Sequence, residues 1–323
     1  MTDAAALAQR VQARIVGRER EVELVVAALA ADRHVLLEGP PGTGKSTLLR
    51  AVATELGVGF EFVEGNAELT PARLVGHFDP ARVLSDGYDP NVFVDGPLVS
   101  ALRDGSLLYV EEINRIPEET LNVLITVMSE RELHVPRLGR VAANAGFRLV
   151  AAMNPFDAVG TARISSAVYD RVCRLAVGYQ TAADEARIVQ VSAPDAALDA
   201  AWLAKVVDVV RATRSHADVR VGSSVRGAID TAAVAVSLGR LRGESPTSPT
   251  VGLDSGIVAL GGRMRLRDGC ARSAEEIVTE IWHSVFDRVD DGRPDDDSAD
   301  GDRRDASGKV IAPTGAASSA TIP

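Results

Sequence analysis

The chain has 323 residues, of which 46% are hydrophobic and 25% are charged, so it is long enough for two globular domains with substantial cores. The formal net charge of −10 disfavours a general nucleic-acid binder, which would carry a basic surface, although much of this acidity falls in residues 287–305. The two cysteines, Cys173 and Cys270, have no paired spacing. Neither a disulfide scaffold nor a zinc site is therefore expected, and both cysteines are predicted to be small core residues.

Neither a leader nor a membrane segment is expected from the hydropathy pattern. Residues 1–20 alternate small, polar and charged side chains and lack the apolar stretch of a secretory signal. No apolar run is long enough to span a bilayer. The cytoplasm is therefore the expected location.

The first part of the chain predicts a strand, a glycine-rich turn and a helix in immediate succession. Residues 34–38 form a short apolar run with the length of a buried strand, and a Gly/Pro-rich turn follows at once. Apolar positions with helical spacing then continue over 46–56. Helices at 2–14 and 19–31 precede this unit, and a second strand at 60–63 follows it.

The next part predicts the remainder of a sheet. Residues 70–97 are rich in Asp, Gly and Pro and predict turns with one small helix. Apolar strands that alternate with helices indicate a parallel sheet covered on both faces, which is an α/β fold. The elements expected beyond residue 97 are a helix at 97–103, a strand at 106–110, a helix at 118–130, hairpin arms at 133–136 and 139–142, and a strand at 147–153.

The character of the sequence changes after Tyr179, where we place a domain boundary. Helices with little strand signal between them are expected at 181–191, 198–213, 223–238 and 274–289. From residue 290 onward large apolar side chains are almost absent, so this tail is expected to be disordered and only to solubilise the chain. The predicted organisation is an α/β core at 1–180, a smaller helical domain at 181–289 and an acidic tail at 290–323.

The strongest functional signal is a phosphate-binding loop with the pattern G-x-x-x-x-G-K-[ST]. Its glycines let the backbone fold tightly, so that successive N–H groups point at phosphate. Lys45 would meet the β- and γ-phosphates, the Ser46 hydroxyl would ligate magnesium, and the following helix directs its positive end at the same anion. The flanking strand and helix make an accidental glycine turn a poor alternative. The residues assigned to ATP are Gly39, Pro40, Pro41, Gly42, Thr43, Gly44, Lys45, Ser46 and Thr47.

Two later strand ends carry polar residues that suit hydrolysis of a nucleoside triphosphate. Glu111 and Glu112 follow the strand at 106–110. The first would hold Mg²⁺, directly or through water, and the second would polarise the attacking water. Asn154 follows the strand at 147–153, and its amide could orient that water. The alternatives are a solvated acid pair and an Asn-Pro turn, and the turn is favoured when Asn154 is considered alone.

In this order, the loop, the acid pair and Asn154 resemble the AAA+ ATPases, whose fold pairs a parallel-sheet P-loop core with a helical lid. Ile15-Val16-Gly17-Arg18 resembles the adenine-side box of that superfamily. The resemblance covers residues 16–282 and is densest over 35–174. Within the superfamily the chain looks like the MoxR group, which is close to the magnesium chelatase AAA+ subunit, through Val110-Glu-Glu-Ile-Asn-Arg115, Pro117, Met153-Asn-Pro155, Gly160 and Tyr169-Asp-Arg171.

The resemblance implies rings, usually hexamers of one chain, with ATP between neighbouring subunits. By position, Glu112 matches the catalytic glutamate and Asn154 the sensor of the γ-phosphate. Val16 lies in the box on the adenine side. These assignments turn the loop into one half of a shared catalytic site.

Two arginines complete the implied site. Arg171 matches the arginine finger that would reach the ATP of the next subunit. Arg226, at a predicted helix start, matches the sensor arginine of the lid. A surface ion pair is the alternative for each arginine, and Arg163 and Arg174 are weaker candidates for the finger.

The acid pair departs from the family pattern, which usually has Asp where this chain has Glu111. The longer side chain still offers a carboxylate, but it moves the acid about one methylene toward the metal, and Mg²⁺ demands strict octahedral geometry. We therefore expect an active but slow ATPase.

Residues 71–97 and 133–142 match an insertion and a hairpin that often face the ring pore or a partner in this branch. Ordinary surface loops are an equally good interpretation. His77 and His134 lie in these segments but have no partner ligand at useful spacing, so no metal site is expected there.

Four functions remain open from the sequence. The first is a MoxR-like, chaperone-like ATPase that remodels or matures a protein, often one that carries a von Willebrand factor A domain. The second is the motor subunit of a metal chelatase. The others are a nucleic-acid motor or nucleotide-gated regulator, for which no basic groove is evident, and a nucleotide-binding assembly protein with a degraded site.

Overall fold

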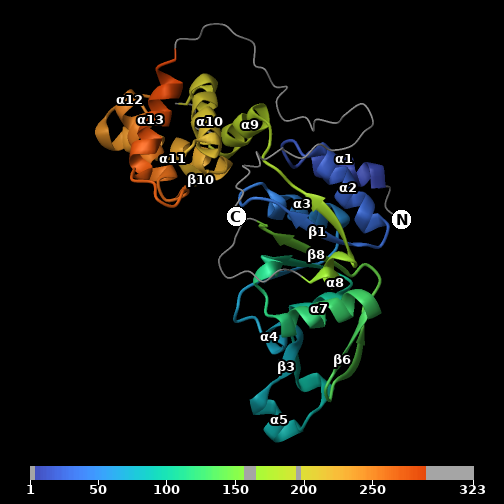
Figure 1. Cartoon of the computed structure of the whole chain (residues 1–323). Coiled ribbons are helices and arrows are strands. Elements are labelled where there is room, and N and C mark those ends of the chain that lie inside the picture. Colours follow the sequence, from blue (N-terminus) through green and yellow to red (C-terminus); the bar gives the residue numbers. More distant parts are fainter. Residues whose placement is uncertain (1–3, 156–164, 194–197, 289–323) are drawn as a thin grey trace, which may run out of the picture. The chain divides into compact units, whose positions relative to one another are not determined.

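The computed structural model describes residues 4–155, 165–193 and 198–288 (Figure 1). Contacts divide the chain into a unit of Met1–Phe286 and a second unit of Asp287–Pro323. The acidic tail predicted at 290–323, Gly160 and the finger candidate Arg163 therefore lie outside the described residues.

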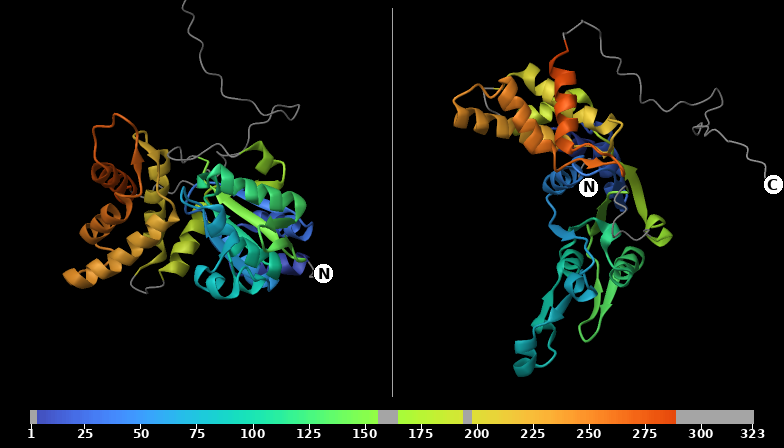
Figure 2. Two further views of the ribbon diagram at one scale, coloured as in Figure 1. Left: turned by 90° about the horizontal axis from the view of Figure 1, so that it is seen from below. Right: turned by 60° about the vertical axis from the view of Figure 1, so that its left-hand side comes forward.

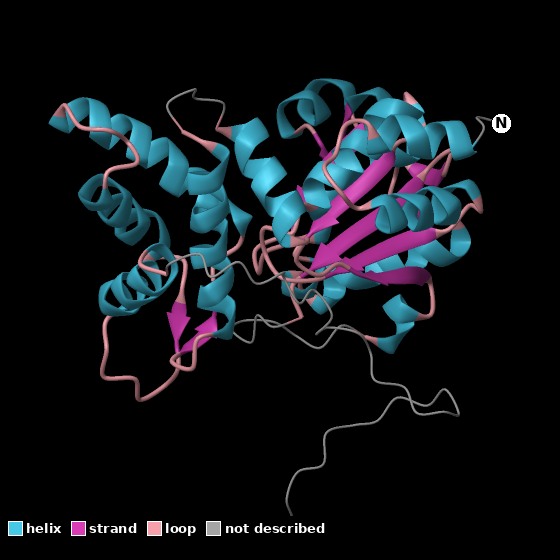
Figure 3. Ribbon diagram, turned by 90° about the horizontal axis from the view of Figure 1, so that it is seen from above, coloured by secondary structure: helices cyan, strands magenta, loops and turns pink. Residues whose placement is uncertain are grey.

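A five-stranded parallel sheet forms the centre of the α/β part (Figure 3). The strand order places the strand before the phosphate loop next to the strand before Asn154, and that strand next to the acid-tipped one. Parallel strands end at one common edge, so the polar strand ends meet there. The order across the sheet is β2 (Phe60–Glu64), β5 (Leu107–Glu111), β8 (Arg148–Met153), β1 (His34–Glu38) and β9 (Val172–Ala176).

Alternation along the strands divides their side chains between two apolar layers. Leu36 and Leu108 pack on one face with residues of α4 (Pro71–Val75), α6 (Pro97–Asp104) and α7 (Glu118–Glu130). Successive strand residues point to opposite faces, so Leu37 and Tyr109 pack on the other face. The helices on that second face are α1 (Ala4–Gln12), α2 (Glu19–Ala30) and α3 (Lys45–Leu56).

The part after β9 is mostly helical and has its own apolar cluster. Trp282 stacks on Phe286 with ring centroids 4.3 Å apart, and a Cβ on Gly256 would lie 2.9 Å from the Trp282 ring. Small residues therefore let α12 approach this ring closely. The elements are α9 (Ala182–Ser192), α10 (Ala200–Ser215), β10 (Val219–Val221), α11 (Val225–Arg242), α12 (Pro249–Leu260), β11 (Arg265–Leu266) and α13 (Ala274–Phe286).

The segment expected to be turns is an ordered arm that lies beside the hairpin (Figures 1 and 2). Phe78 meets Tyr88 and Phe93 edge-on, at 5.2 and 5.1 Å between ring centroids, and the Arg137 guanidinium lies 3.6 Å from the Tyr88 ring centre. After α4, the arm contains β3 (Gly76–Phe78), α5 (Pro80–Asp86), η1 (Pro90–Val92) and β4 (Phe93–Asp95), and the hairpin is β6 (Glu132–Val135) with β7 (Gly139–Ala142).

The α/β fold class is confirmed, with several elements added to the prediction. The hairpin predicted at 133–136 and 139–142 is present as β6 and β7, whereas β9, the pairs β3–β4 and β10–β11, and α12 were not expected. Cys173 is exposed on β9, and Cys270 is only partly buried, so the prediction of two core cysteines was wrong for Cys173. Its edge strand buries no residue fully. In the part of the chain that the structure describes, no helix has the length and apolar character needed to cross a bilayer.

Candidate nucleotide-binding site

The predicted phosphate loop joins the carboxyl end of β1 to the first residue of α3, Lys45. Gly42 has a φ of 73°, in the left-handed region that favours glycine. A Cβ on Gly39 would lie 2.0 Å from the Val177 carbonyl oxygen, so no larger residue fits there. The Thr43 hydroxyl donates to the Pro40 carbonyl at 3.0 Å and closes the turn. The loop therefore has the tight backbone that phosphate binding requires.

Lys45 lies inside this loop, with 8% of its surface exposed. Its Nζ donates to the carbonyl oxygens of Gly39 and Pro40, both at 2.8 Å. Burial lowers the pKa of Lys45 from its ordinary value, while the charges of Glu111 and Glu112 act in the opposite direction. The ammonium group is thus held at the centre of the loop, beside both acids of the predicted pair.

The two predicted metal ligands are in contact. The Ser46 hydroxyl, in the first turn of α3, lies 3.2 and 3.0 Å from the two carboxylate oxygens of Glu111, at the end of β5. The Tyr109 hydroxyl lies 3.1 Å from the same Ser46 oxygen. Mg²⁺ prefers hard oxygen ligands, and a hydroxyl beside a carboxylate meets that preference. The residues present therefore fit the metal that the sequence predicts.

Glu112 follows directly and has a left-handed backbone with φ 51° and ψ 44°. This turn separates its side chain from that of Glu111. Its Oε2 lies 3.4 Å from the Arg115 guanidinium, and 27% of the side chain is exposed. A partly exposed carboxylate close to the Lys45 charge is placed to act on a water molecule near the loop.

Asn154 is the residue immediately after β8, and it is half-buried. β8 lies between β1 and β5, and the Gly39 N–H donates to the carbonyl of Met153 at 3.1 Å. The structure thus brings the start of the loop, Asn154 and the acid pair to one edge of the sheet, as predicted.

Part of this chain is similar in sequence to known proteins. Residues 34–172 match the family described as an AAA domain of the dynein-related subfamily. Protein MoxR of Methylorubrum extorquens is 39% identical over 132 residues, which are 41% of this chain and 37% of that protein. The gas vesicle ATPase GvpN of Ancylobacter aquaticus is 32% identical over 216 residues, which are 61% of this chain and 59% of that protein.

The chain therefore contains an AAA domain at residues 34–172, and its homologues include proteins named MoxR and GvpN. It spans less than two thirds of the length of these two relatives. The RuvB Holliday junction branch migration motor of Thermotoga maritima matches with a TM-score of 0.53 at 18% identity, over 78% of this chain and 72% of that one. At that identity the match shows a shared fold.

Arg18 is a site residue that the sequence analysis did not single out. Its guanidinium donates to the Thr43 carbonyl at 3.0 Å, to the Gly178 carbonyl at 2.6 Å and to Glu21 at 2.8 Å. Only 7% of its side chain is exposed. Arg18 therefore joins the predicted adenine-side box to the phosphate loop and to the segment after β9. Its place in that box was the available signal.

Val16 and Arg226 reach the loop region from opposite parts of the sequence. The Val16 carbonyl accepts a hydrogen bond from the Gln180 side chain at 2.5 Å. Arg226 lies in the first turn of α11, and its charge is close enough to lower the pKa of Lys45. A Cβ on Gly42 would meet the Ser224 hydroxyl at 2.2 Å, so the start of α11 packs against the loop.

Arg171 is the predicted site residue that the structure does not bring to the loop. It immediately precedes β9, whose first residue pairs with His34 at the amino end of β1. The loop follows the carboxyl end of β1, so roughly 15 Å of strand separates the two positions. Nη1 of Arg171 donates to the Ala167 carbonyl at 2.8 Å, and Nε donates to the Ser129 hydroxyl.

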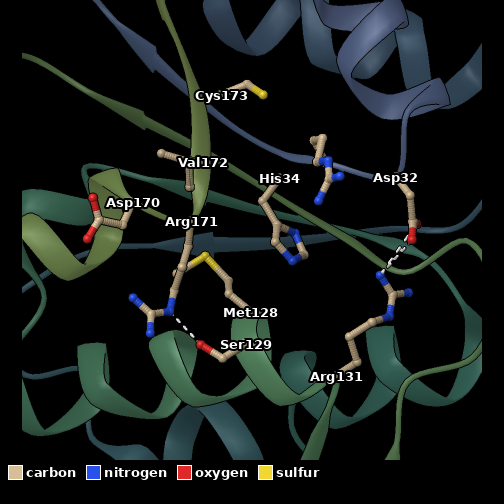
Figure 4. Close-up of a pocket in the computed structure, with 10 residues that line it drawn as sticks. Asp32, His34, Met128, Ser129, Arg131, Asp170, Arg171, Val172 and Cys173 are labelled. Atoms are coloured by element: carbon tan, nitrogen blue, oxygen red, sulfur yellow. Dashed lines mark hydrogen bonds and ion pairs between the residues drawn. The ribbon is translucent and has the colours of Figure 1, made fainter.

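The Arg171 guanidinium lines a cavity of about 510 Å³ at the amino ends of the strands (Figure 4). His34 lies beside it, and Arg131 forms an ion pair with Asp32 on the far side. Burial, with the charges of Arg131 and Arg148, lowers the pKa of His34 to about 4. Its ring is therefore neutral at physiological pH.

Arg174, a weaker candidate for the finger, has a partner within the chain. It forms an ion pair with Glu38, the last residue of β1, whose side chain is 5% exposed. The Tyr169 hydroxyl donates to the same carboxylate at 2.7 Å. Arg174 thus neutralises a buried acid beside the loop, which is the ion-pair alternative considered for each arginine.

Proposed function

We propose that the chain is a Mg²⁺-dependent ATPase that acts as a homo-oligomeric ring, usually a hexamer, and couples hydrolysis to the remodelling or maturation of a partner protein. The observation that carries this proposal is the position of Arg171. Ser46, Glu111 and Glu112 meet at the loop, whereas Arg171 lies at the opposite end of the sheet. Such a site is complete only when a second copy supplies its arginine.

Each group at the loop has a distinct task in this proposal. Lys45 and the loop N–H groups bind the phosphates, with the α3 N-terminus directed at the same charge. Ser46 and Glu111 hold Mg²⁺, which neutralises phosphate charge. Glu112 takes the proton of the attacking water, and Asn154 orients that water.

The two arginines act where charge develops. Arg171 of one copy stabilises the charge on the transferring phosphoryl group in the next copy. Arg226 contacts the phosphates from α11 and so connects the nucleotide to the helical part. We propose residues 1–180 as the catalytic core, 181–289 as a lid that moves against it, and Val16 as a contact on the adenine side.

The partner class is proposed from the resemblance to the MoxR group. We propose a protein client, or a protein with a von Willebrand factor A domain, in the cytoplasm. The ordered arm that carries α5 supports a protein partner, because Leu84 on that helix is 90% exposed. A chelatase-type motor subunit is the alternative, and a nucleic-acid-associated ATPase comes after it. The name of the relative GvpN places that ATPase with gas vesicles, which gives one further setting to examine.

Two measurements test this function. ATPase activity per mole of chain should rise with protein concentration, because each site needs a neighbour. Glu112→Gln should abolish hydrolysis while leaving nucleotide binding and rings intact. If the purified protein hydrolyses no ATP at any concentration, the motor function is wrong. Stimulation by single-stranded DNA would instead favour the nucleic-acid alternative.

A further inference from the structure

A buried tyrosine lies in the strand that carries the acid pair. Tyr109 is the third residue of β5 and has no exposed surface. Its ring packs near Phe60 and Phe62, with centroids 5.8 and 5.6 Å away. A phenylalanine would supply the same apolar packing, so the hydroxyl needs a separate explanation.

The Tyr109 hydroxyl lies next to the predicted metal ligands. It lies 3.1 Å from the Ser46 hydroxyl, which itself contacts both oxygens of Glu111. Because the Ser46 hydroxyl donates its one proton to Glu111, its oxygen accepts the proton of the phenol. The phenol therefore holds Ser46 in the orientation that contacts the acid.

The free-energy cost of leaving a buried hydroxyl unpaired explains why Tyr109 would restrain the group that it binds. A buried hydroxyl without a partner costs about 1–3 kcal/mol, so the phenol holds whichever partner satisfies it. Glu111 has one more rotatable bond than the Asp usual in this position, and an unrestrained longer side chain would place its oxygens less reproducibly. A fixed donor at the end of a buried ring orients the Ser46 hydroxyl, and the hydrogen bond from Ser46 limits the freedom of Glu111.

We propose that Tyr109 is a positioning residue for the Mg²⁺ ligands: its hydroxyl orients Ser46, and Ser46 in turn fixes the Glu111 carboxylate, so that Glu can hold the metal where Asp is usual. This inference rests on the proposed function only in taking Ser46 and Glu111 as the metal ligands. The effect of Tyr109 passes through Ser46 and Glu111.

The test uses Tyr109→Phe in the full chain, which keeps the ring and removes the hydroxyl. Binding of a fluorescent ATP analogue is measured over a range of Mg²⁺ concentrations and again in EDTA. We expect the half-saturating Mg²⁺ concentration to rise about tenfold, as the loss of one buried hydrogen bond predicts. Binding in EDTA should stay unchanged. Tyr179→Phe, which removes a hydroxyl from a half-buried tyrosine beside Arg214, is the matched control.

A second variant separates positioning from packing. In a Glu111→Asp background the shorter acid no longer depends on the same donor, so adding Tyr109→Phe should change the Mg²⁺ requirement less than twofold. An equal tenfold effect in both backgrounds would overturn the proposal, as would weaker binding by Tyr109→Phe in EDTA. If the wild-type chain binds no ATP analogue at all, the proposed function fails. If it binds and Tyr109→Phe keeps the wild-type Mg²⁺ dependence, only this inference fails.

Discussion

The Ser46 hydroxyl lies 3.0 and 3.2 Å from the carboxylate oxygens of Glu111, although one residue lies in the first turn of α3 and the other ends β5. β8 alone lies between β5 and β1, the strand that leads into the loop and α3, so the contact depends on the strand order of the sheet. This contact connects the helix that follows the phosphate loop to the acid pair. The consequences of this arrangement can be tested residue by residue.

Removal of the Ser46 hydroxyl should weaken binding of ATP mainly when Mg²⁺ is present. Ser46→Ala deletes one proposed metal ligand and leaves the loop backbone unchanged, so we expect the Kd for Mg²⁺-ATP to rise about tenfold or more, the equivalent of one charged hydrogen bond. Titration calorimetry with and without Mg²⁺ measures the difference. Ser237→Ala, on an exposed part of α11, is the control. An equal loss in EDTA would argue against a metal role.

Lys45→Ala should remove most nucleotide affinity, because the ammonium group is the positive charge at the centre of the loop. We expect the Kd for ATP to rise at least tenfold, as the loss of one or more hydrogen bonds to charged phosphate predicts. Lys205→Ala removes a lysine that lies over the Phe286 ring, and it should bind like the wild type. Retained affinity in Lys45→Ala would mean that the nucleotide binds elsewhere.

Arg18→Ala should destabilise the chain and loosen the loop together. The buried guanidinium satisfies two carbonyl oxygens and the carboxylate of Glu21, and hydrogen bonds to charged groups contribute about 1.5–3 kcal/mol each. We expect a loss of about 2–4 kcal/mol in the free energy of unfolding, measured in urea, with weaker ATP binding. Arg20→Ala, two residues away and exposed, should change neither quantity. A stable Arg18→Ala chain with normal affinity would refute the connecting role.

His34 should make the stability depend on pH in a defined window. The folded chain holds the pKa of His34 at about 4, against 6.5 ordinarily, because the ring is buried near Arg131 and Arg148, with Asp32 opposing them. Below pH 6.5 the unfolded chain binds a proton that the folded chain excludes. The free energy of unfolding should therefore fall as the pH drops from 6.5 to 4, by about 3 kcal/mol in all.

The contribution of His34 can be isolated with His34→Asn, whose side-chain oxygen can still accept the Leu149 N–H that the ring nitrogen accepts at 2.9 Å. This variant should lose the dependence between pH 6.5 and 4 that wild type and the exposed-site control His77→Asn retain. Urea unfolding at several pH values provides the comparison. An unchanged pH profile in His34→Asn would show that other groups cause the dependence.

The local sequence was sufficient where one segment determines its own structure. The sequence predicted the glycine-rich loop, the apolar strands β1 and β5, and the helix α7. It also predicted that the acid pair and Asn154 follow strand ends. β9 was missed because its exposed positions, including Cys173 and Arg174, break the apolar pattern. α12 was missed because its glycines lower helix propensity, while packing against Trp282 favours them.

Side-chain contacts between distant segments were also out of reach. Nothing near Tyr109 in the sequence indicates that its hydroxyl contacts Ser46, because that contact arises only when α3 packs against β5 in the folded chain. The same holds for Arg18, whose partners Thr43 and Gly178 come together only in the folded chain. Charged residues of this kind have no periodicity that predicts their partner.

The central claim is that Arg171 acts on the site of a neighbouring copy, and mixing two inactive variants tests it most directly. Glu112→Gln retains Arg171 but cannot activate water, and Arg171→Ala retains Glu112 but lacks the finger. Mixed in equal amounts, these variants should recover a clear fraction of wild-type ATPase activity. Glu112→Gln mixed with Lys45→Ala, two defects on the same half of the site, should recover none. An inactive mixture of Arg171→Ala and Glu112→Gln, in oligomers shown to contain both chains, would contradict the shared site.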